Sequence, residues 1–302
     1  MKESRKTREE ETSEDSTLKA KVLAFLKEFG IVFGAFLILN NFVIASFLVP
    51  TGSMENEVMT GDLLFVNKFI YGGTSPRNIP FTNVRLPWFR VPSFRDVERG
   101  DVIVFVFPGY RDEVNPEDFT FYLKRCVAIS GDTLQLAKRV LYVNGKPSPL
   151  PRNMLFSFPR MASGGGVVDD RLFPKGSQWN EDNYGPIVIP KKGMVVHLDS
   201  STIDAWDTFI RREGHTVAVK GNQIEIDGKL TTEYTVQRDY LFGMGDHRDN
   251  SLDSRYWGFV PKENIVGTPM IVYWSWDTDI PIYNIFSKLA SVRLGRIGTI
   301  IK

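Results

Sequence analysis

Hydrophobic positions along the chain fall into two patterns, one continuous and one interrupted. In the continuous pattern, residues 29–49 contain no charged side chain, and only two glycines, two asparagines and one serine interrupt the apolar run. A helix needs about 20 apolar residues to cross a bilayer. The run therefore predicts a transmembrane anchor over residues 22–47, which leaves the bilayer near Ser46.

Two other readings of this run are weaker. A cleaved signal peptide has an apolar core of roughly 7 to 15 residues behind a short basic region. Here the run is longer and follows a tail rich in acidic residues. A buried core helix is also disfavoured, because the run is apolar on all sides.

The charges that flank the anchor predict its orientation. Lys19, Lys21 and Lys27 precede the run, and no Lys or Arg occurs between Gly30 and Asn67. Basic residues favour the cytoplasmic side, so we expect a cytoplasmic N-terminus and a chain that lies on the far side after the span. Residues 1–21 carry mixed charges and few apolar side chains, which predicts a disordered cytoplasmic tail.

The interrupted pattern begins near Leu63. Short apolar or alternating runs are separated by Gly, Pro, Asn and Asp, as is typical of strands joined by turns. Residues 143–146 (Val-Asn-Gly-Lys) and 226–229 (Ile-Asp-Gly-Lys) are hairpin turn signals. One short helix is predicted over residues 203–210, with Ser200 or Ser201 as its cap and Gly214 just beyond its end.

These elements predict a mostly β protein. The N-terminal transmembrane helix is followed by a β-rich domain of antiparallel sheets over residues 48–302, with insertions at about 72–96 and 147–240. The first insertion carries Phe81, Trp88, Phe89 and Phe94 among four prolines. Such aromatic side chains either enter the lipid headgroup layer or pack as a covered loop on the sheet, and the pattern slightly favours the second reading. The loop-rich residues 147–184 include three consecutive glycines at 164–166.

Composition narrows the function classes. The chain has 302 residues and a formal net charge of +1, without the basic surplus typical of nucleic-acid binding. Cys126 is the single cysteine, so no disulfide can form within the chain. His197, His215 and His247 lie far apart, and no spacing typical of a zinc site occurs. No metal or other cofactor is expected.

Ser53 is the candidate nucleophile. It follows the anchor in the turn Pro50-Thr51-Gly52-Ser53-Met54. Most serines in such turns carry no chemistry, but this one is expected at the membrane surface. Gly52 permits close backbone approach, and the Thr51 hydroxyl together with the Ser53 N–H could stabilise an oxyanion.

A serine nucleophile requires a base, and two candidates exist. Asp246 and His247 are adjacent, but neighbouring residues of an extended chain point to opposite sides, so this pair is a poor start for a triad. Lys124 lies in a predicted strand among large apolar residues, where partial desolvation would lower its pKa. The alternative reading is an ordinary solvated strand lysine.

Four ordered motifs resemble those of bacterial type I signal peptidases. The first is the Ser53 turn followed by Gly61-Asp62. The second is Asn67-Lys68-Phe69. The third comprises Arg99-Gly100-Asp101-Val102, Lys124-Arg125 and Gly131-Asp132. The fourth runs from Gly245 to Gly258 and matches nearly throughout.

This resemblance implies a role for each matching position. Ser53 would be the nucleophile, Lys124 the general base, and Thr51 with the Ser53 N–H the oxyanion hole. Ser251 would orient the lysine amine, whereas Asp253, Arg255 and Gly245 would be structural. Phe47, Val49, Pro50, Tyr122 and Leu123 would bind the substrate.

The resemblance also implies an activity and a place. A membrane-anchored serine endopeptidase would remove signal peptides from exported preproteins after small residues (Ala-X-Ala type) through an acyl-enzyme. It would be a single-pass protein of the bacterial inner membrane, with its catalytic domain on the periplasmic side. Its partners would be preproteins and the lipid bilayer, with no nucleic acid.

The sequence departs from the family pattern at two places. The family often has Pro-Thr-Leu shortly after the nucleophile, where this chain has residues 54–58 as Met-Glu-Asn-Glu-Val. His247 stands where Asn is also common, and we interpret it as a turn residue rather than a base.

Two other functions remain as alternatives. One is a different serine–lysine peptidase on a related β scaffold, such as a self-cleaving repressor, which the anchor disfavours. The other is a tethered β domain that binds precursors without cutting them, which the presence of both Ser53 and Lys124 disfavours.

Overall fold

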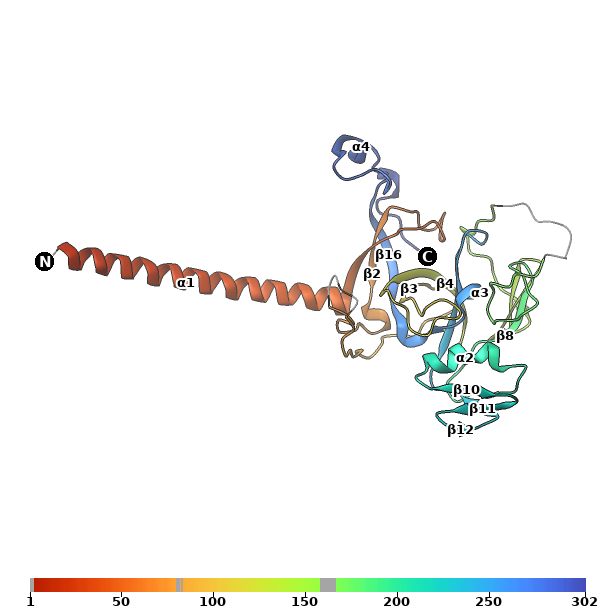
Figure 1. Cartoon of the computed structure of the whole chain (residues 1–302). Coiled ribbons are helices and arrows are strands. Elements are labelled where there is room, and N and C mark those ends of the chain that lie inside the picture. The colour runs from red at the N-terminus through yellow and green to blue at the C-terminus, as the bar shows by residue number, and fades with distance from the viewer. Residues whose placement is uncertain (1–2, 80–81, 83, 158–166) are drawn as a thin grey trace.

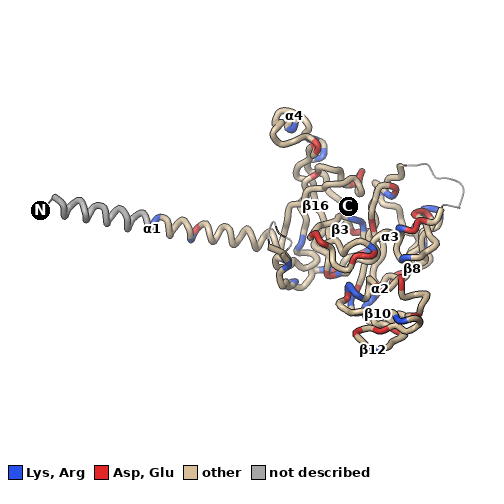
Figure 2. The backbone as a smooth tube through the Cα atoms, viewed as in Figure 1, with Lys and Arg blue, Asp and Glu red and all other residues tan. Residues whose placement is uncertain are grey.

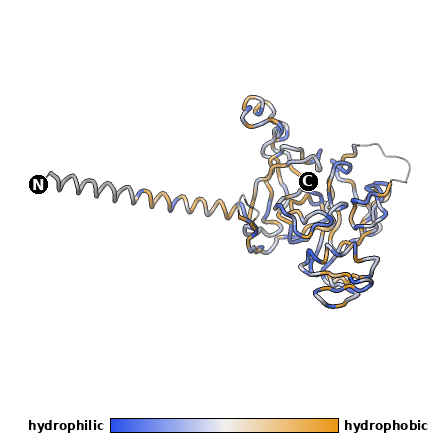
Figure 3. The backbone as a smooth tube through the Cα atoms, in the orientation of Figure 1, coloured by the Kyte–Doolittle hydropathy of each residue, from blue (hydrophilic) through white to orange (hydrophobic). Residues whose placement is uncertain are grey.

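A single long helix precedes a β domain (Figure 1). The computed structural model describes residues 3–79, 82, 84–157 and 167–302. Helix α1 (Glu3–Ile38) continues into a π-helical turn, η1 (Leu39–Val43). Within it, Ala20–Val43 is long and apolar enough to cross a membrane, and none of its most apolar window is buried against the protein. Charged residues thin out along this stretch (Figure 2), and it is predominantly hydrophobic (Figure 3).

Both ends of the predicted anchor region differ from expectation. Residues 3–21, which their composition predicted to be disordered, continue α1. The segment is rich in Glu, Lys and Arg, which are strong helix formers. At the other end the helical part stops at Val43 rather than at residue 47, because Ile44 is already extended and begins strand β1 (Ile44–Leu48). The apolar residues 44–48 therefore belong to a sheet.

The main sheet has seven antiparallel strands and supports the prediction of a mostly β domain. Its spatial order differs from the chain order, since the last long strand inserts between the second and third. In order, the strands are β1, β2 (Asp62–Asn67), β16 (Ile265–Ser275), β3 (Val102–Val106), β4 (Phe121–Ile129), β14 (Tyr240–Met244) and β15 (Val260–Pro261).

Strand β1 forms one edge of this sheet and pairs only with β2 among the described residues. The rings of Phe47 on β1 and Phe121 on β4 nevertheless meet edge to face, with centroids 5.1 Å apart. Since three strands separate β1 from β4 in the sheet order, the sheet must curve to bring them together. This curvature opens a cleft between the edge strand and the start of β4.

Residues 130–239 leave the main sheet between β4 and β14 and form the predicted second insertion. It begins after Ile129 rather than at about residue 147, because β5 pairs with β6 and β8 instead of joining the main sheet. Its described residues form three small sheets. The first contains, in order, β7 (Lys146–Pro147), β6 (Val140–Val143), β5 (Thr133–Ala137) and β8 (Tyr184–Val188). The second contains β10 (Val217–Lys220), β11 (Gln223–Ile226) and β12 (Lys229–Leu230), and the third pairs β13 (Glu233–Thr235) with β9 (Val195–His197).

The short-range predictions in this insertion are largely confirmed. Both Asx-Gly turns connect paired strands, β6 to β7 and β11 to β12. The predicted helix is α2 (Ile203–Arg212), and Gly214 follows it at φ 98°. The predicted cap is wrong, because α2 begins after Thr202. The Asp199 carboxylate instead accepts the N–H groups of Ser201 and Thr202.

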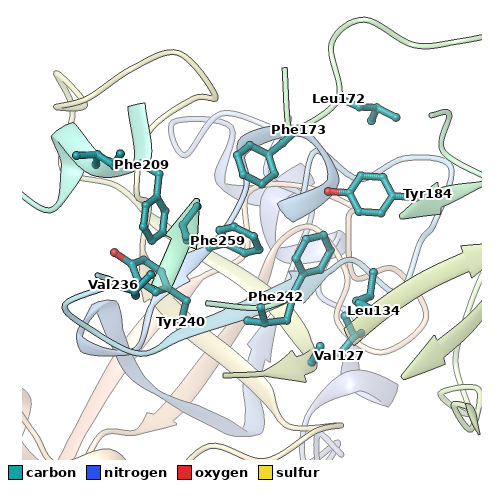
Figure 4. Close-up of a cluster of buried hydrophobic side chains, with 14 of the residues drawn as sticks. Val127, Leu134, Leu172, Phe173, Tyr184, Phe209, Val236, Tyr240, Phe242 and Phe259 are labelled. Atoms are coloured by element: carbon teal, nitrogen blue, oxygen red, sulfur yellow. The ribbon is translucent and has the colours of Figure 1, made fainter. Parts of the chain in front are cut away.

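Two short helices were not predicted, α3 (Ser254–Trp257) and α4 (Ile285–Ala290). The insertion and the main sheet share one core, which contains Val127 and Phe242 of the sheet together with Leu134, Tyr184 and Phe209 of the insertion (Figure 4). A shared apolar core ties the two parts together, so the insertion is expected to fold with the main sheet.

The first insertion, residues 72–96, is not the covered loop that the sequence slightly favoured. Phe89 and Phe94 are 61% and 80% exposed, and Trp88 is also exposed. Phe89 packs on Phe42 in the last turn of the anchor, with ring centroids 5.8 Å apart. Exposed aromatic side chains therefore gather beside the end of the anchor. Phe81 lies outside the described residues, as do the glycines at 164–166.

Candidate active site

Ser53 lies in the turn that follows the edge strand β1. Two backbone hydrogen bonds hold the start of this turn, from the Val49 N–H to the Asp62 carbonyl and from the Gly61 N–H to the Val49 carbonyl, both 2.9 Å. Ser53 is buried, and its carbonyl accepts the N–H of His247 at 3.1 Å. The fourth sequence motif is thus attached directly to the first.

Lys124 lies in the middle of β4, opposite Ile103 of β3. Its side chain is 3% exposed, and its Nζ lies 2.5 Å from the Ser53 Oγ. Gly243 of β14 leaves room for the lysine stem, since a Cβ there would meet the Lys124 Cβ at 3.2 Å. Two residues 71 positions apart in the sequence are therefore brought into hydrogen-bonding distance.

Burial lowers the pKa of Lys124 to about 8. The main cause is desolvation, which disfavours the charged ammonium. Asp253 and Asp246 act in the opposite direction, whereas Arg255 lowers the pKa further. A substantial fraction of Lys124 is thus neutral near pH 8 and able to accept a proton.

Asp253 and Arg255 form a buried ion pair beside this lysine, with the carboxylate and guanidinium 3.0 Å apart. Burial alone would raise the pKa of Asp253, but Arg255 keeps it below its usual value. Asp253 also accepts the backbone N–H groups of Arg255, at the start of α3, and of Gly245. Gly245 has no room for a side chain, since a Cβ would lie 2.2 Å from the Ser251 Oγ and 2.5 Å from the Ser53 carbonyl oxygen.

Two further predicted site residues, Ser251 and Thr51, lie near the pair. Ser251 is buried, but its Oγ has no hydrogen-bond partner among the residues that the structure describes. The predicted bond from Ser251 to the lysine amine is therefore not formed here. Thr51 is exposed at the rim of the cleft, two residues before Ser53.

A second buried ion pair of the site, between Arg125 and Asp246, was not predicted. Arg125 binds Asp246 through two guanidinium nitrogens, at 2.8 and 2.6 Å, and donates to the carbonyls of Gly100 and Lys302. Asp246 thus points toward Arg125 while His247 points elsewhere, as the alternation along an extended chain predicts. The sequence holds one sign of this ion pair: Arg125 directly follows Lys124 in the third motif, and Asp246 directly precedes His247 in the fourth.

A cleft of about 650 Å³ ends at Ser53 and Lys124. The five residues predicted to bind the substrate all line it, together with several that the sequence did not single out. The predicted ones are Phe47, Val49, Pro50, Tyr122 and Leu123; the added ones include Met54, Leu64, Phe119, Asn250 and Leu252. Strands β1 and β4 form facing walls, so the cleft suits an extended chain.

An apolar cleft beside a membrane anchor, with a buried serine and lysine at its end, is the arrangement of a membrane-tethered hydrolase. Comparison with known proteins identifies the family. The signal peptidase family, peptidase S26, matches residues 22–274. The chain belongs to this family.

Individual relatives agree with this assignment. A signal peptidase I of Pseudomonas aeruginosa is 31% identical over 255 residues, which are 80% of this chain and 68% of that protein. A signal peptidase I of Helicobacter pylori is 28% identical and covers 78% of this chain and 76% of its own. A relative from Buchnera aphidicola, with the same name, is 27% identical over 96% of this chain and 86% of its own.

A crystal structure of a signal peptidase I from Enterococcus faecalis is also similar, at 19% identity over 58% of this chain and 97% of that chain. Its TM-score of 0.25 is too low to support an assignment of the fold. The family and its relatives make this chain a signal peptidase, an enzyme that removes signal peptides from preproteins during secretion.

Proposed function

We propose that Ser53 is the nucleophile and Lys124 the general base of this peptidase. The observation that carries the proposal is the 2.5 Å separation of the Lys124 Nζ and the Ser53 Oγ in a buried site that lowers the pKa of the lysine to about 8. A base with a pKa near the working pH combines the correct protonation state with sufficient driving force. The expected cycle passes through an acyl-enzyme.

In the first half of the cycle, neutral Lys124 accepts the hydroxyl proton of Ser53, and the Oγ attacks the carbonyl carbon of the scissile bond. The Ser53 N–H and the Thr51 hydroxyl stabilise the resulting oxyanion. When the carbon–nitrogen bond breaks, the Lys124 ammonium gives its proton to the leaving amine. An ester then joins Ser53 to the signal peptide.

In the second half, neutral Lys124 accepts a proton from water, and the hydroxide attacks the ester carbonyl. The ammonium then returns its proton to the Ser53 Oγ as the signal peptide leaves with a free carboxyl group. Ser251 remains the candidate to orient the lysine amine when a substrate is present, because its Oγ is buried and unpaired within the described structure. Asp253 and Arg255 would hold the site together without touching the substrate.

The substrate would bind as an extended strand between β1 and the start of β4. Strand β1 is an edge, and β14 pairs only with residues 125–129 of β4, so residues 121–123 lack a neighbour on that side among the described strands. Adding a strand to a free edge supplies main-chain hydrogen bonds. The aromatic and aliphatic walls of the cleft favour small side chains, as in Ala-X-Ala, at the −1 and −3 positions.

We further propose that the catalytic domain, residues 48–302, lies on the periplasmic side of the bacterial inner membrane, with residues 1–21 cytoplasmic. The lysines before the span support this orientation. The exposed aromatic side chains of residues 72–96, beside the last turn of the anchor, support contact with the headgroup layer. The anchor would then keep the cleft at the depth where a membrane-held substrate emerges.

Cleavage of one secretory precursor by the purified protein tests this function. Ser53→Ala and Lys124→Ala should each abolish processing while the fold remains intact, and a penem-type acylating inhibitor should label Ser53. Full activity of Lys124→Ala would contradict the dyad. Clipping of the protein itself in the absence of substrate would favour the self-cleaving alternative.

A further inference from the structure

Residues 153–157 of the second insertion cross over the turn that carries the nucleophile. We refer to residues 153–157 as the strap and to residues 52–58 as the nucleophile loop. The strap pairs with the fourth motif through a parallel bridge between Leu155 and His247. Backbone hydrogen bonds from the Leu155 N–H to the Asp246 carbonyl and from the Arg248 N–H to the Leu155 carbonyl, both 3.0 Å, flank this bridge.

Side chains extend these contacts to the nucleophile loop. Asn153 donates to the Glu57 carboxylate at 2.6 Å. The Ser157 Oγ lies 2.5 Å from the Nε2 of His247. The Nδ1 of the same ring lies 3.2 Å from a carboxylate oxygen of Glu55, within ion-pair distance but without hydrogen-bond geometry. The His247 ring is buried between them. One imidazole thus joins a strap residue to a loop residue two positions after Ser53.

His247 also touches the nucleophile itself through its backbone. Its N–H donates to the Ser53 carbonyl at 3.1 Å, so movement of this residue would move Ser53. None of Glu55, Ser157 and His247 lines the substrate cleft among the described residues. Their contacts are with one another and with the Ser53 carbonyl rather than with the cleft.

The strap contacts add to the support that the nucleophile loop has of its own. The Glu55 N–H donates to the Gly52 carbonyl at 3.0 Å and the Val58 N–H to the Met54 carbonyl at 2.8 Å, and the side chains of Met54 and Val58 are buried. Asn56 adopts φ 75°, a left-handed conformation that costs free energy for a residue with a side chain. No proline restricts residues 52–58. Its two glutamates also contact other segments. Glu57 accepts from Asn153 and from the Lys302 N–H, and the Glu55 carboxylate lies at ion-pair distance from the His247 ring.

We propose that His247 is a positioning residue that, together with the strap, holds the nucleophile loop in the geometry of attack. This inference rests on the proposed Ser53–Lys124 dyad. From the family resemblance, His247 was interpreted as a tolerated turn residue. In the structure it lies next to Glu55, so the residues at the two departures from the family pattern are in contact. Displacement of a nucleophile by about 1 Å can cost about 100-fold in rate.

The test measures kcat and KM of the full-length protein in detergent with a short peptide that spans the cleavage site. His247→Ala should lower kcat about 10- to 100-fold with KM within about twofold. His247→Asn, which keeps a side-chain donor, should recover most of this loss. The rate of Ser53 acylation by a penem should fall in parallel with kcat, which reports on the nucleophile independently of peptide binding.

Milder variants keep the test decisive if His247→Ala does not fold. Ser157 is exposed at the surface, so Ser157→Ala should fold and lower kcat about fivefold, the equivalent of one hydrogen bond. Ser200→Ala, at an exposed serine elsewhere in the same insertion, is the matched control and should behave as wild type. In a double-mutant cycle, Glu55→Ala should add little to His247→Ala, because both break the same connection.

Three outcomes would overturn this inference. They are unchanged kcat in both His247→Ala and Ser157→Ala, a rise in KM with kcat unchanged, or full additivity of the Glu55 and His247 variants. Retained activity in Ser53→Ala or Lys124→Ala would instead overturn the dyad itself. The two failures are therefore distinguishable.

Discussion

Lys124 and Lys68 are both buried lysines of the main sheet region, yet their surroundings differ. They are 3% and 8% exposed, and burial lowers the pKa of each to about 8. The Lys68 Nζ donates to the Asn40 carbonyl at 3.1 Å, next to the end of the anchor. The Lys124 Nζ lies 2.5 Å from a serine hydroxyl at the end of a cleft.

A lowered lysine pKa and a catalytic role are separate properties in this protein. Desolvation is the main cause of both pKa shifts, and for Lys68 the nearby Arg77 and Arg90 add to it. A depressed pKa is therefore not sufficient to mark a catalytic base. The neighbouring hydroxyl and the substrate cleft distinguish Lys124, whereas Lys68 is placed to join the domain to its anchor.

The largest expected effect is on activity. Lys124→Ala should lower kcat/KM for a short peptide at least about 1,000-fold, since both proton transfer and activation of the nucleophile are lost. Lys68→Met, at the other buried lysine, should stay within about fivefold of wild type, because it removes no group near the cleft. Comparable losses from both variants would contradict the distinction.

The next effect concerns the ion pair beside the base. Arg255→Met leaves the Asp253 carboxylate buried without its partner, which should cost about 3–5 kcal/mol in the free energy of unfolding. Arg255 lowers the pKa of Lys124, so its removal should also move the basic limb of activity to higher pH. Denaturant titration and a pH–rate profile check the two parts separately.

A smaller effect is expected on stability as a function of pH. The pKa of Lys124 is about 8 in the folded protein and 10.5 in its ordinary state. The cost of burying the charged ammonium is therefore at its full value below pH 8 and disappears as the pH rises to 10.5. Lys124→Met should therefore gain up to about 3 kcal/mol at neutral pH, less the lost contact with Ser53, and nothing at pH 10.5. Lys68→Met should show the same pH window without the loss of activity.

The smallest effect tests the region near Lys68 as a membrane contact. Phe94→Ser should lower cleavage of a precursor in lipid vesicles about two- to fivefold, because it removes apolar area from the headgroup layer. Cleavage of a short soluble peptide in detergent should not change. Val219→Ser, at a half-exposed apolar residue on β10 of the second insertion, is the control (Figure 1). An equal loss in both assays would argue against membrane contact.

Local patterns in the sequence were sufficient for much of the fold. The anchor, the Asx-Gly hairpins and α2 each depend on a few neighbouring residues, and each is present. The start of the second insertion was misplaced because strand pairing decides it: β5 has the same alternation whether it pairs with a strand of the main sheet or with β6 and β8. The end of the anchor was misplaced because residues 44–48 are apolar in either a helix or a sheet edge.

The candidate site shows the same division. Ser53 and Lys124 were predicted together because ordered motifs carried them, and the structure places them in contact. The strap contacts could not be predicted, since Ser157 and His247 are 90 positions apart and no short-range pattern joins them. Ser251 lacks its expected bond to the lysine in this structure.

The most direct test of the central claim is the pH dependence of Ser53 acylation by a penem, measured by stopped flow. A neutral Lys124 as the base predicts a rate that rises with pH through an apparent pKa of about 8 and then levels off. The Lys68→Met variant should retain this limb, and Lys124→Ala should lose it together with the rate. A limb near the ordinary lysine value of 10.5, or an unchanged limb in Lys124→Ala, would contradict the account.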